Sequence, residues 1–64
     1  MTPDEINELL SLKGWRMINL AAELDVSESA VYKWINRISN PLEKYCMKMR
    51  RLLDDARDSM AGAK

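Results

Sequence analysis

The sequence predicts a small all-α protein, and three observations carry that prediction. Apolar residues recur at three- and four-residue spacing along most of the chain, which is the period of a helix with one buried face. Helix-start signatures stand at Thr2 and at Asn40, each followed directly by proline. No segment alternates apolar and polar residues as a half-buried strand does. The 64 residues allow one domain of four to five helices, expected at residues 1–60 with a frayed tail at 61–64.

The first helix is expected at residues 3–13. Thr2 and Glu5 form a Thr-x-x-Glu capping box, in which each side chain accepts a hydrogen bond from the backbone N–H of the other residue. Pro3 suits the first helical position, because the N–H that it lacks would have no partner there. Gly14 follows the last turn and readily adopts the left-handed conformation that ends helices. The apolar face is expected to comprise Ile6, Leu9 and Leu10.

Two shorter helices are expected at residues 17–24 and 28–37. Arg16 precedes the first and is a poor N-cap, because its side chain cannot accept a hydrogen bond from the free backbone N–H groups. Ser27 precedes the second and is a good N-cap. Asp25 falls in the short break between them. The buried positions are predicted to be Ile18, Leu20, Ala21 and Leu24 in the first of these helices and Ala30, Val31, Trp34, Ile35 and Ile38 in the second.

A long final helix is expected at residues 41–59. Asn40 as the cap, Pro41 at the first position and Glu43 at the third form its start signature. Its apolar positions are Leu42, Tyr45, Cys46, Met49, Leu52, Leu53, Ala56 and Met60. Surface ion pairs are expected between residues four apart, namely Arg50 with Asp54 and Arg51 with Asp55.

The composition excludes several classes of protein. The chain has no histidine and a single cysteine, so zinc-finger, Cys–His and Ser–His–Asp sites cannot form within it. We therefore expect no metal, no cofactor and no enzymatic activity. No apolar run approaches the roughly 18 residues that a membrane span needs. Residues 2–5 resemble no secretory signal, so the chain is expected to be cytoplasmic.

The charges cancel in total but are unevenly distributed. The formal net charge is zero. Residues 1–28 hold six acidic and two basic side chains, whereas residues 29–53 hold six basic and one acidic. The local field matters more to a polyanion than the sum of charges, so the basic middle is a candidate nucleic-acid surface. The alternative is an ordinary solvated face.

Residues 17–37 have the layout of a helix-turn-helix. Ala21 is small where the two helices would cross, and Val26, Val31 and Trp34 would fill the space between them. In this motif the second helix presents polar side chains to the major groove of DNA.

The segment LAAELDVSESAVYKWINR, residues 20–37, is similar to the helix-turn-helix of the phage Cro and CI repressors and of the wider lambda-repressor-like (XRE) family. The matching positions are Leu20-Ala21, Val26-Ser27, Val31, Trp34 and the Asn40-Pro41 opening of the next helix. The resemblance covers about residues 5–55. It implies a lambda-repressor-like fold and a Cro-type transcriptional repressor encoded by a bacterium, phage or prophage.

The resemblance also implies a set of contacts with double-stranded DNA. Its base-reading positions fall on Glu28, Ser29, Tyr32 and Lys33. Its phosphate contacts fall on Arg16, Asn19, Ser27, Asn36, Arg37 and Lys44. Lys33 is a donor for guanine O6 and N7, and Glu28 is an acceptor for cytosine N4.

Three positions depart from the family pattern. Asp25 stands where the family commonly has a glycine in a left-handed turn, a conformation that Asp tolerates at some strain. Met17 stands where a polar residue contacts a phosphate, so Arg16 or Asn19 must substitute or the contact is absent. Glu28 suits the positive end of the helix dipole equally well without any base contact.

The last helix carries more apolar residues than a core of this size would cover. Leu52, Leu53, Ala56 and Met60 are therefore predicted to form a homodimer seam. Dimers of the family bind inverted repeats with half-sites about one helical turn apart. The alternative is a monomer that folds this helix back on the first one.

Two other functions remain open from the sequence. An antitoxin-like or phage accessory-operon autoregulator would bind DNA in the same way. A helical protein-interaction module would not, and the zero net charge favours it, as do Met17, Asp25 and Glu28. A salt-dependent affinity for DNA separates the module from the DNA-binding proteins.

Overall fold

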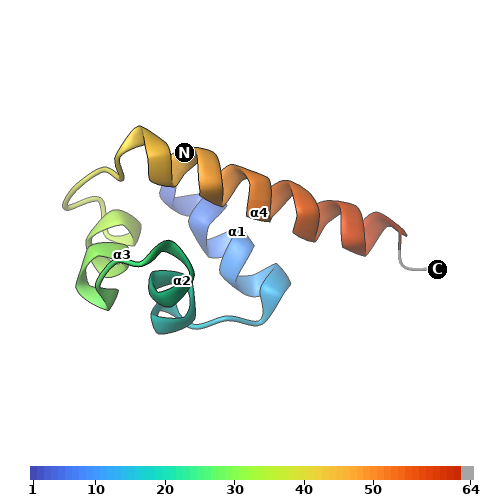
Figure 1. The fold of residues 1–64 in the computed structure, drawn as a ribbon, viewed down its shortest axis with the longest axis horizontal. Coiled ribbons are helices and arrows are strands. Elements are labelled where there is room, and N and C mark those ends of the chain that lie inside the picture. The colour runs from blue at the N-terminus through green and yellow to red at the C-terminus, as the bar shows by residue number, and fades with distance from the viewer. Residues whose placement is uncertain (63–64) are drawn as a thin grey trace.

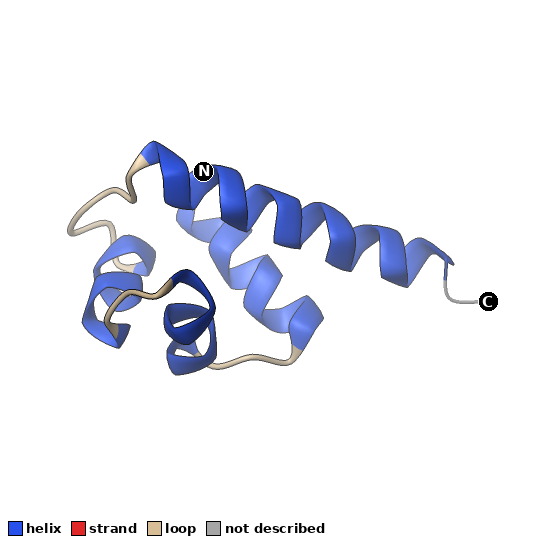
Figure 2. Ribbon diagram, in the orientation of Figure 1, coloured by secondary structure: helices blue, strands red, loops and turns tan. Residues whose placement is uncertain are grey.

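The computed structural model describes residues 1–62, which form four helices and no strand. The helices are α1 (Pro3–Lys13), α2 (Met17–Leu24), α3 (Glu28–Ile35) and α4 (Glu43–Gly62). In Figure 1, α4 is a long rod with α1 packed along it, while α2 and α3 form a pair beside the first half of α4. Figure 2 shows that loops alone connect these helices. The described chain is thus a small all-α domain, as predicted.

Helix α1 has the predicted bounds and the predicted start. The Thr2 backbone N–H donates to Glu5 Oε1 at 3.0 Å, and the Glu5 backbone N–H donates to Thr2 Oγ1 at 3.3 Å. Gly14 ends the helix with φ 66° and ψ 33°, in the left-handed region. The capping box and the glycine stop are both confirmed.

Helix α2 also has the predicted bounds, although Arg16 at its start has no acceptor in its side chain. Asn19 compensates from inside the helix. Its Oδ1 accepts a hydrogen bond from the Arg16 backbone N–H at 2.8 Å. This is the reciprocal arm of a capping box, supplied without a capping residue at the N-cap itself.

Helix α3 ends at Ile35, so the predicted extension to residue 37 is wrong. The Ile38 N–H donates back to the Lys33 carbonyl at 2.9 Å, and the Arg37 N–H donates to the Trp34 carbonyl at 3.3 Å. Arg37 has φ 62°. These bonds and this left-handed residue close the helix and turn the chain away from its axis.

Helix α4 begins at Glu43, later than predicted. The backbone N–H groups of Tyr45 and Cys46 both donate to the Leu42 carbonyl, at 2.9 and 3.0 Å, so Leu42 and not Asn40 is the N-cap. The helix continues to Gly62. Residues 61 and 62 of the predicted tail therefore belong to α4, and residues 63 and 64 lie outside the described residues.

The core contains the apolar residues that face inward from all four helices. Trp34 is 6% exposed, as predicted, and Trp15 is partly buried against the core. The buried residues are Ile6, Leu9, Leu20, Ala21, Leu24, Val31, Trp34, Met49, Leu53 and Ala56. Cys46, predicted as one of the apolar positions of the last helix, is only partly buried, and its Sγ lies 3.6 Å from the Pro41 carbonyl oxygen.

Three residues predicted to be buried are instead exposed. Ile18 is 51% exposed, because it precedes Leu20 by two residues and so lies roughly 200° away around α2. Ile38 is 63% exposed, since the chain has already left α3 at that point. Leu42 is 64% exposed, since it precedes the first turn of α4.

Two of the residues predicted to form a homodimer seam belong to the core of the single chain. Leu53 is 0% exposed and Ala56 is 5% exposed, on the side of α4 that packs against α1. Leu52 is partly buried against the same core. The side chain of Met60 lies outside the described residues. The helix thus folds back on α1, and the prediction of Leu53 and Ala56 as an exposed seam is wrong.

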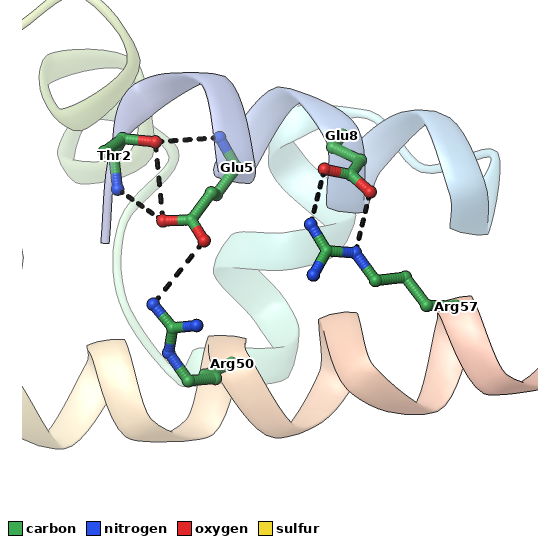
Figure 3. Close-up of polar contacts among 5 residues, drawn as sticks. All are labelled: Thr2, Glu5, Glu8, Arg50 and Arg57. Carbon is green, nitrogen blue, oxygen red and sulfur yellow. Dashed lines mark hydrogen bonds and ion pairs between the residues drawn. The ribbon is translucent and has the colours of Figure 1, made fainter.

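Two ion pairs join α1 to α4 (Figure 3). Arg57 donates to both oxygens of Glu8 through Nε and Nη2, each at 2.8 Å. Arg50 Nη2 lies 3.5 Å from Glu5 Oε2. The predicted Arg50–Asp54 and Arg51–Asp55 pairs do not form in the described chain, and Arg50 pairs with Glu5 of α1 instead.

These contacts shift the pKa of the groups that make them. The pKa of Glu8 is lowered, chiefly by its hydrogen bonds from Arg57, and the pKa of Arg57 is raised by the same contact. The pKa of Glu5 is lowered first by the hydrogen bond from the Thr2 backbone, and also by the charge of Arg50. Glu5 therefore serves both the start of α1 and its attachment to α4.

Candidate nucleic-acid interface

Helices α2 and α3 form a helix-turn-helix joined by residues 25–27. The Val26 N–H donates to the Ala21 carbonyl at 2.9 Å, which ends α2, and Asp25 has φ 58° and ψ 46°. Ser27 then opens α3, with its Oγ accepting from the Ala30 N–H at 3.2 Å. Asp25 thus occupies the left-handed turn position that the resemblance implied, and Ser27 is the predicted N-cap.

The outer face of α3 carries the residues predicted to read bases. Val31 and Trp34 bury the inner face, and the Trp34 ring packs 5.7 Å from the Tyr45 ring of α4, centroid to centroid. This contact fixes the rotation of α3 about its axis. The residues left exposed on the outer face are Glu28, Ser29, Tyr32, Lys33 and Asn36.

Three predicted phosphate contacts also hold helix ends in place. Asn19 Oδ1 caps the start of α2, and Ser27 Oγ caps the start of α3. Asn36 Nδ2 donates to the Tyr32 carbonyl at 2.9 Å at the end of α3. The Asn19 amide hydrogens and the Ser27 hydroxyl hydrogen have no acceptor among the described residues. Both side chains are therefore fixed by one atom and able to donate through another.

Six basic side chains show the contrast between paired and unpaired charges in this structure. Arg50 and Arg57 pair with carboxylates of α1. Lys33 and Arg37, at the end of α3, are exposed and form no ion pair within the part of the chain described. The same holds for Arg16 before α2 and for Lys44 in the first turn of α4, whose Nζ lies 5.0 Å from the Tyr45 ring centroid.

Lys48 of α4 is exposed, and its Nζ donates to the Glu23 carbonyl at 3.1 Å. Glu23 lies in the last turn of α2, where unpaired carbonyl groups carry the negative end of the helix dipole. This lysine therefore attaches α4 to the helix-turn-helix, a role that the sequence analysis missed. The spacing along the chain gives no signal for it, because the two residues are 25 positions apart.

Glu28 is the one acidic side chain among the predicted base readers. It is exposed in the first turn of α3, next to the Ser27 cap. The structure places no cation beside it among residues 1–62. Its position fits both interpretations made from the sequence, interaction with the helix dipole and hydrogen bonding to a base.

All ten residues predicted to contact DNA are exposed, and they come from α2, α3, the N-cap residue before each of these helices, the loop after α3 and the first turn of α4. No group of three or more His, Cys, Asp or Glu residues capable of holding a metal occurs over residues 1–62, and no pocket opens in that part of the structure. None of the helices there has the length and apolar character needed to cross a bilayer.

Comparisons with protein-family models, with curated proteins and with solved structures return no match for this chain.

Proposed function

We propose that this protein binds double-stranded DNA sequence-specifically through its helix-turn-helix and acts as a transcriptional repressor resembling the Cro-type members of the lambda-repressor-like family. One observation carries the proposal. Three basic side chains without an ion pair in the described chain lie on α3, in the loop after it and in the first turn of α4, namely Lys33, Arg37 and Lys44, whereas Arg50 and Arg57 of α4 are neutralised by carboxylates of α1. A phosphate backbone supplies the negative charge that Lys33 and Arg37 lack within the chain.

In this proposal α3 enters the major groove. Lys33 donates to guanine O6 and N7, and Tyr32, which is 49% exposed, packs its ring on a thymine methyl group. Ser29 donates to or accepts from a base edge one turn earlier, and Glu28 accepts from cytosine N4. The Trp34–Tyr45 contact keeps these side chains facing outward, since α3 cannot rotate without breaking it.

The phosphate contacts flank α3 on both sides. Arg16 and Asn19 stand at the start of α2 and Ser27 at the start of α3, where free backbone N–H groups also favour an anion. Arg37 and Lys44 stand on the other side, between α3 and α4. Such contacts fix the register of a protein on DNA, and the base contacts then specify the sequence.

The proposal includes a homodimer that covers a promoter by binding an inverted repeat. Because Leu53 and Ala56 are buried in their own chain, the pairing has to use apolar side chains that remain exposed, and Met47 at 63% and Leu42 at 64% are available. Sedimentation velocity across high micromolar concentrations is expected to reveal a species of twice 7.4 kDa. The dimer would be excluded if the free protein sediments as a single 7.4 kDa species and if only one chain binds each inverted-repeat duplex.

The experiment that tests DNA binding is enrichment from a pool of random duplexes, followed by sequencing, at two salt concentrations. An inverted repeat is the expected product, with binding that weakens steeply as salt rises. If no sequence is enriched and the chain fails to bind DNA at low salt, the proposal is wrong. A protein-interaction module would then be the better interpretation of the exposed apolar residues of α4.

A further inference from the structure

The side of α4 that faces solvent carries a continuous stripe of charged side chains. Lys44, Lys48, Arg51, Asp55 and Asp58 follow one another at alternating spacings of four and three residues, and all of them are exposed. At about 100° per residue these positions fall within an arc of about 80°, on the side of the helix away from its buried residues. We call these five residues the outer stripe.

The two signs of charge are separated along the outer stripe. The residues of its first half are basic, and those of its second half are acidic. None of them forms an ion pair within residues 1–62, although Arg51 and Asp55 stand one turn apart. Lys48 Nζ donates to the Glu23 carbonyl at 3.1 Å, but an ammonium group has further N–H donors to offer. The stripe therefore has one positive half and one negative half, and neither is neutralised within the described chain.

Such a stripe is complementary to a second copy of itself that runs in the opposite direction. A twofold axis that makes two α4 helices antiparallel brings the basic half of each stripe against the acidic half of the other. Helices that pack through alternating three- and four-residue spacings meet in layers, with one position of each helix in every layer. With the axis midway between Arg51 and Asp55, Arg51 lies opposite the partner's Asp55, and Lys48 lies opposite the partner's Asp58. Each of these contacts occurs twice.

Other partners fit the outer stripe less well. A second copy in the parallel direction would place like charges opposite each other along the whole stripe. A DNA backbone would attract the basic half but would be repelled by Asp55 and Asp58. A bilayer with anionic headgroups would meet the same two carboxylates. The charge pattern therefore favours an antiparallel second copy.

We infer that two copies of this chain pair through the outer stripes of their α4 helices, with Arg51 against the partner's Asp55 and Lys48 against the partner's Asp58. The inference rests on the homodimer of the proposed function and names the surface that forms it. Met47, which is 63% exposed, stands one turn before Arg51 and adds an apolar contact beside the stripe. Exposed ion pairs are individually weak and are screened by salt, so this pairing depends on ionic strength.

The test is sedimentation velocity of the full chain without DNA. Arg51→Glu and Asp55→Lys each place like charges opposite one another, twice in every dimer. The double variant Arg51→Glu/Asp55→Lys exchanges the two charges and so restores both contacts, and an equimolar mixture of the two single variants does the same. Glu28→Lys is the matched control, since it makes the same change of charge as Asp55→Lys on the exposed face of α3. Circular dichroism of each variant separates a loss of pairing from a loss of fold.

The wild type is expected to form a species of twice 7.4 kDa at about 50 mM salt and to dissociate at about 1 M salt, where the Debye length is only about 3 Å. Each single variant should self-associate about tenfold more weakly, because like charges facing each other across an interface are unfavourable. The double variant and the mixture should recover the wild-type affinity, and Glu28→Lys should match the wild type. All variants should stay folded, since the substituted side chains are exposed.

Three results would overturn the inference and leave the homodimer standing. They are a dimer that persists at high salt, single variants that pair as tightly as the wild type, and a double variant or mixture that fails to recover the pairing. A wild type that remains a single 7.4 kDa species at low salt and high micromolar concentration would remove the homodimer together with the inference. None of these results decides whether the chain binds DNA, which the duplex enrichment tests separately.

Discussion

The α1–α4 half of this molecule and the α2–α3 half differ in whether their arginine and lysine side chains form ion pairs within the chain. Between α1 and α4, arginines and glutamates meet in pairs, and Arg57 engages both oxygens of Glu8 at 2.8 Å (Figure 3). Directly before α2, on α3 and in the loop after α3, the basic side chains Arg16, Lys33 and Arg37 form no ion pair within residues 1–62. The first arrangement holds the chain together, and the second leaves positive charge available to a partner.

The difference shows why a net charge of zero says little about this protein. Glu5 and Glu8, two of the six acidic residues of the N-terminal segment, face Arg50 and Arg57 of α4, so their charge cancels there. Lys33 and Arg37 keep their charge because no carboxylate of the described chain reaches them. A polyanion responds to this local surplus and not to the total.

The largest expected effect is a loss of stability in the α1–α4 half. Leu53→Ala removes a side chain that is fully buried against α1, at a cost of about 2–5 kcal/mol. A chain of this size has a stability of only a few kcal/mol, so this variant should be largely unfolded at 25 °C by circular dichroism. Leu42→Ala, at a leucine that is 64% exposed, should change stability by less than about 0.5 kcal/mol. Equal effects of the two substitutions would contradict the assignment of Leu53 to the core.

The next largest expected effect is a loss of DNA affinity in the α2–α3 half, without a change in the stability of the fold. Lys33→Ala should weaken binding by about 1–3 kcal/mol at one base-pair position of the enriched site, since the lost contact is to a single base. Its thermal unfolding should match the wild type, because Lys33 is exposed and makes no contact that holds α3. A loss that is uniform over all sequences would reassign Lys33 to a phosphate.

A smaller effect concerns the left-handed helix ends. Gly14→Ala should destabilise the chain by about 1 kcal/mol, measured by urea unfolding. A Cβ atom built at Gly14 has no other atom within 4 Å, so the cost is conformational and not a clash. Gly14→Asn is the control, because asparagine tolerates the left-handed region and should recover part of the loss. An unchanged stability for Gly14→Ala would show that the left-handed end of α1 imposes no conformational cost on a residue with a Cβ atom.

The smallest effect is the pH dependence of the α1–α4 contacts. The pKa values of Glu5 and Glu8 lie below their usual value of 4.5 in the folded chain. Their stabilising contribution is thus complete above that value and is lost as the pH falls through the lowered pKa values. Thermal unfolding should occur at a lower temperature at pH 3 than at pH 6, and the change should be smaller in Glu8→Gln. Identical pH profiles for the two proteins would show that Glu8 contributes nothing.

The sequence predicted the helices whose ends have clear chemical signals. Thr2, Glu5 and Gly14 mark α1 by side chains that match the backbone groups left free there. The bounds of residues 17–24 agree with the prediction even though Arg16 is a poor cap, and Asn19 contributes the reciprocal hydrogen bond, in which its Oδ1 accepts from the Arg16 backbone N–H. The end of α3 could not be predicted in this way, since arginine carries no signal for a left-handed backbone.

The late start of α4 and the exposure of Ile38 and Leu42 follow from the early end of α3. Because α3 ends at Ile35, residues 36–42 are needed to reach α4, and the Asn40-Pro41 signature is used in the connection rather than at the helix start. Ile38 and Leu42 become exposed for the same reason. Leu53 and Ala56 were assigned to a dimer seam because a linear pattern does not reveal that α1 lies along α4. The exposure of the ten candidate site residues was predictable, since it needs only the helical period and a correct core.

The most direct test of the contrast between the two halves is a map of backbone amide chemical shifts during titration with the enriched duplex. We expect the chemical shifts to change at residues 16–19, 27–37 and 44, with little change in the second half of α1 and in α4 beyond residue 52. Changes concentrated along α1 and the end of α4, or no changes at any duplex concentration, would contradict it.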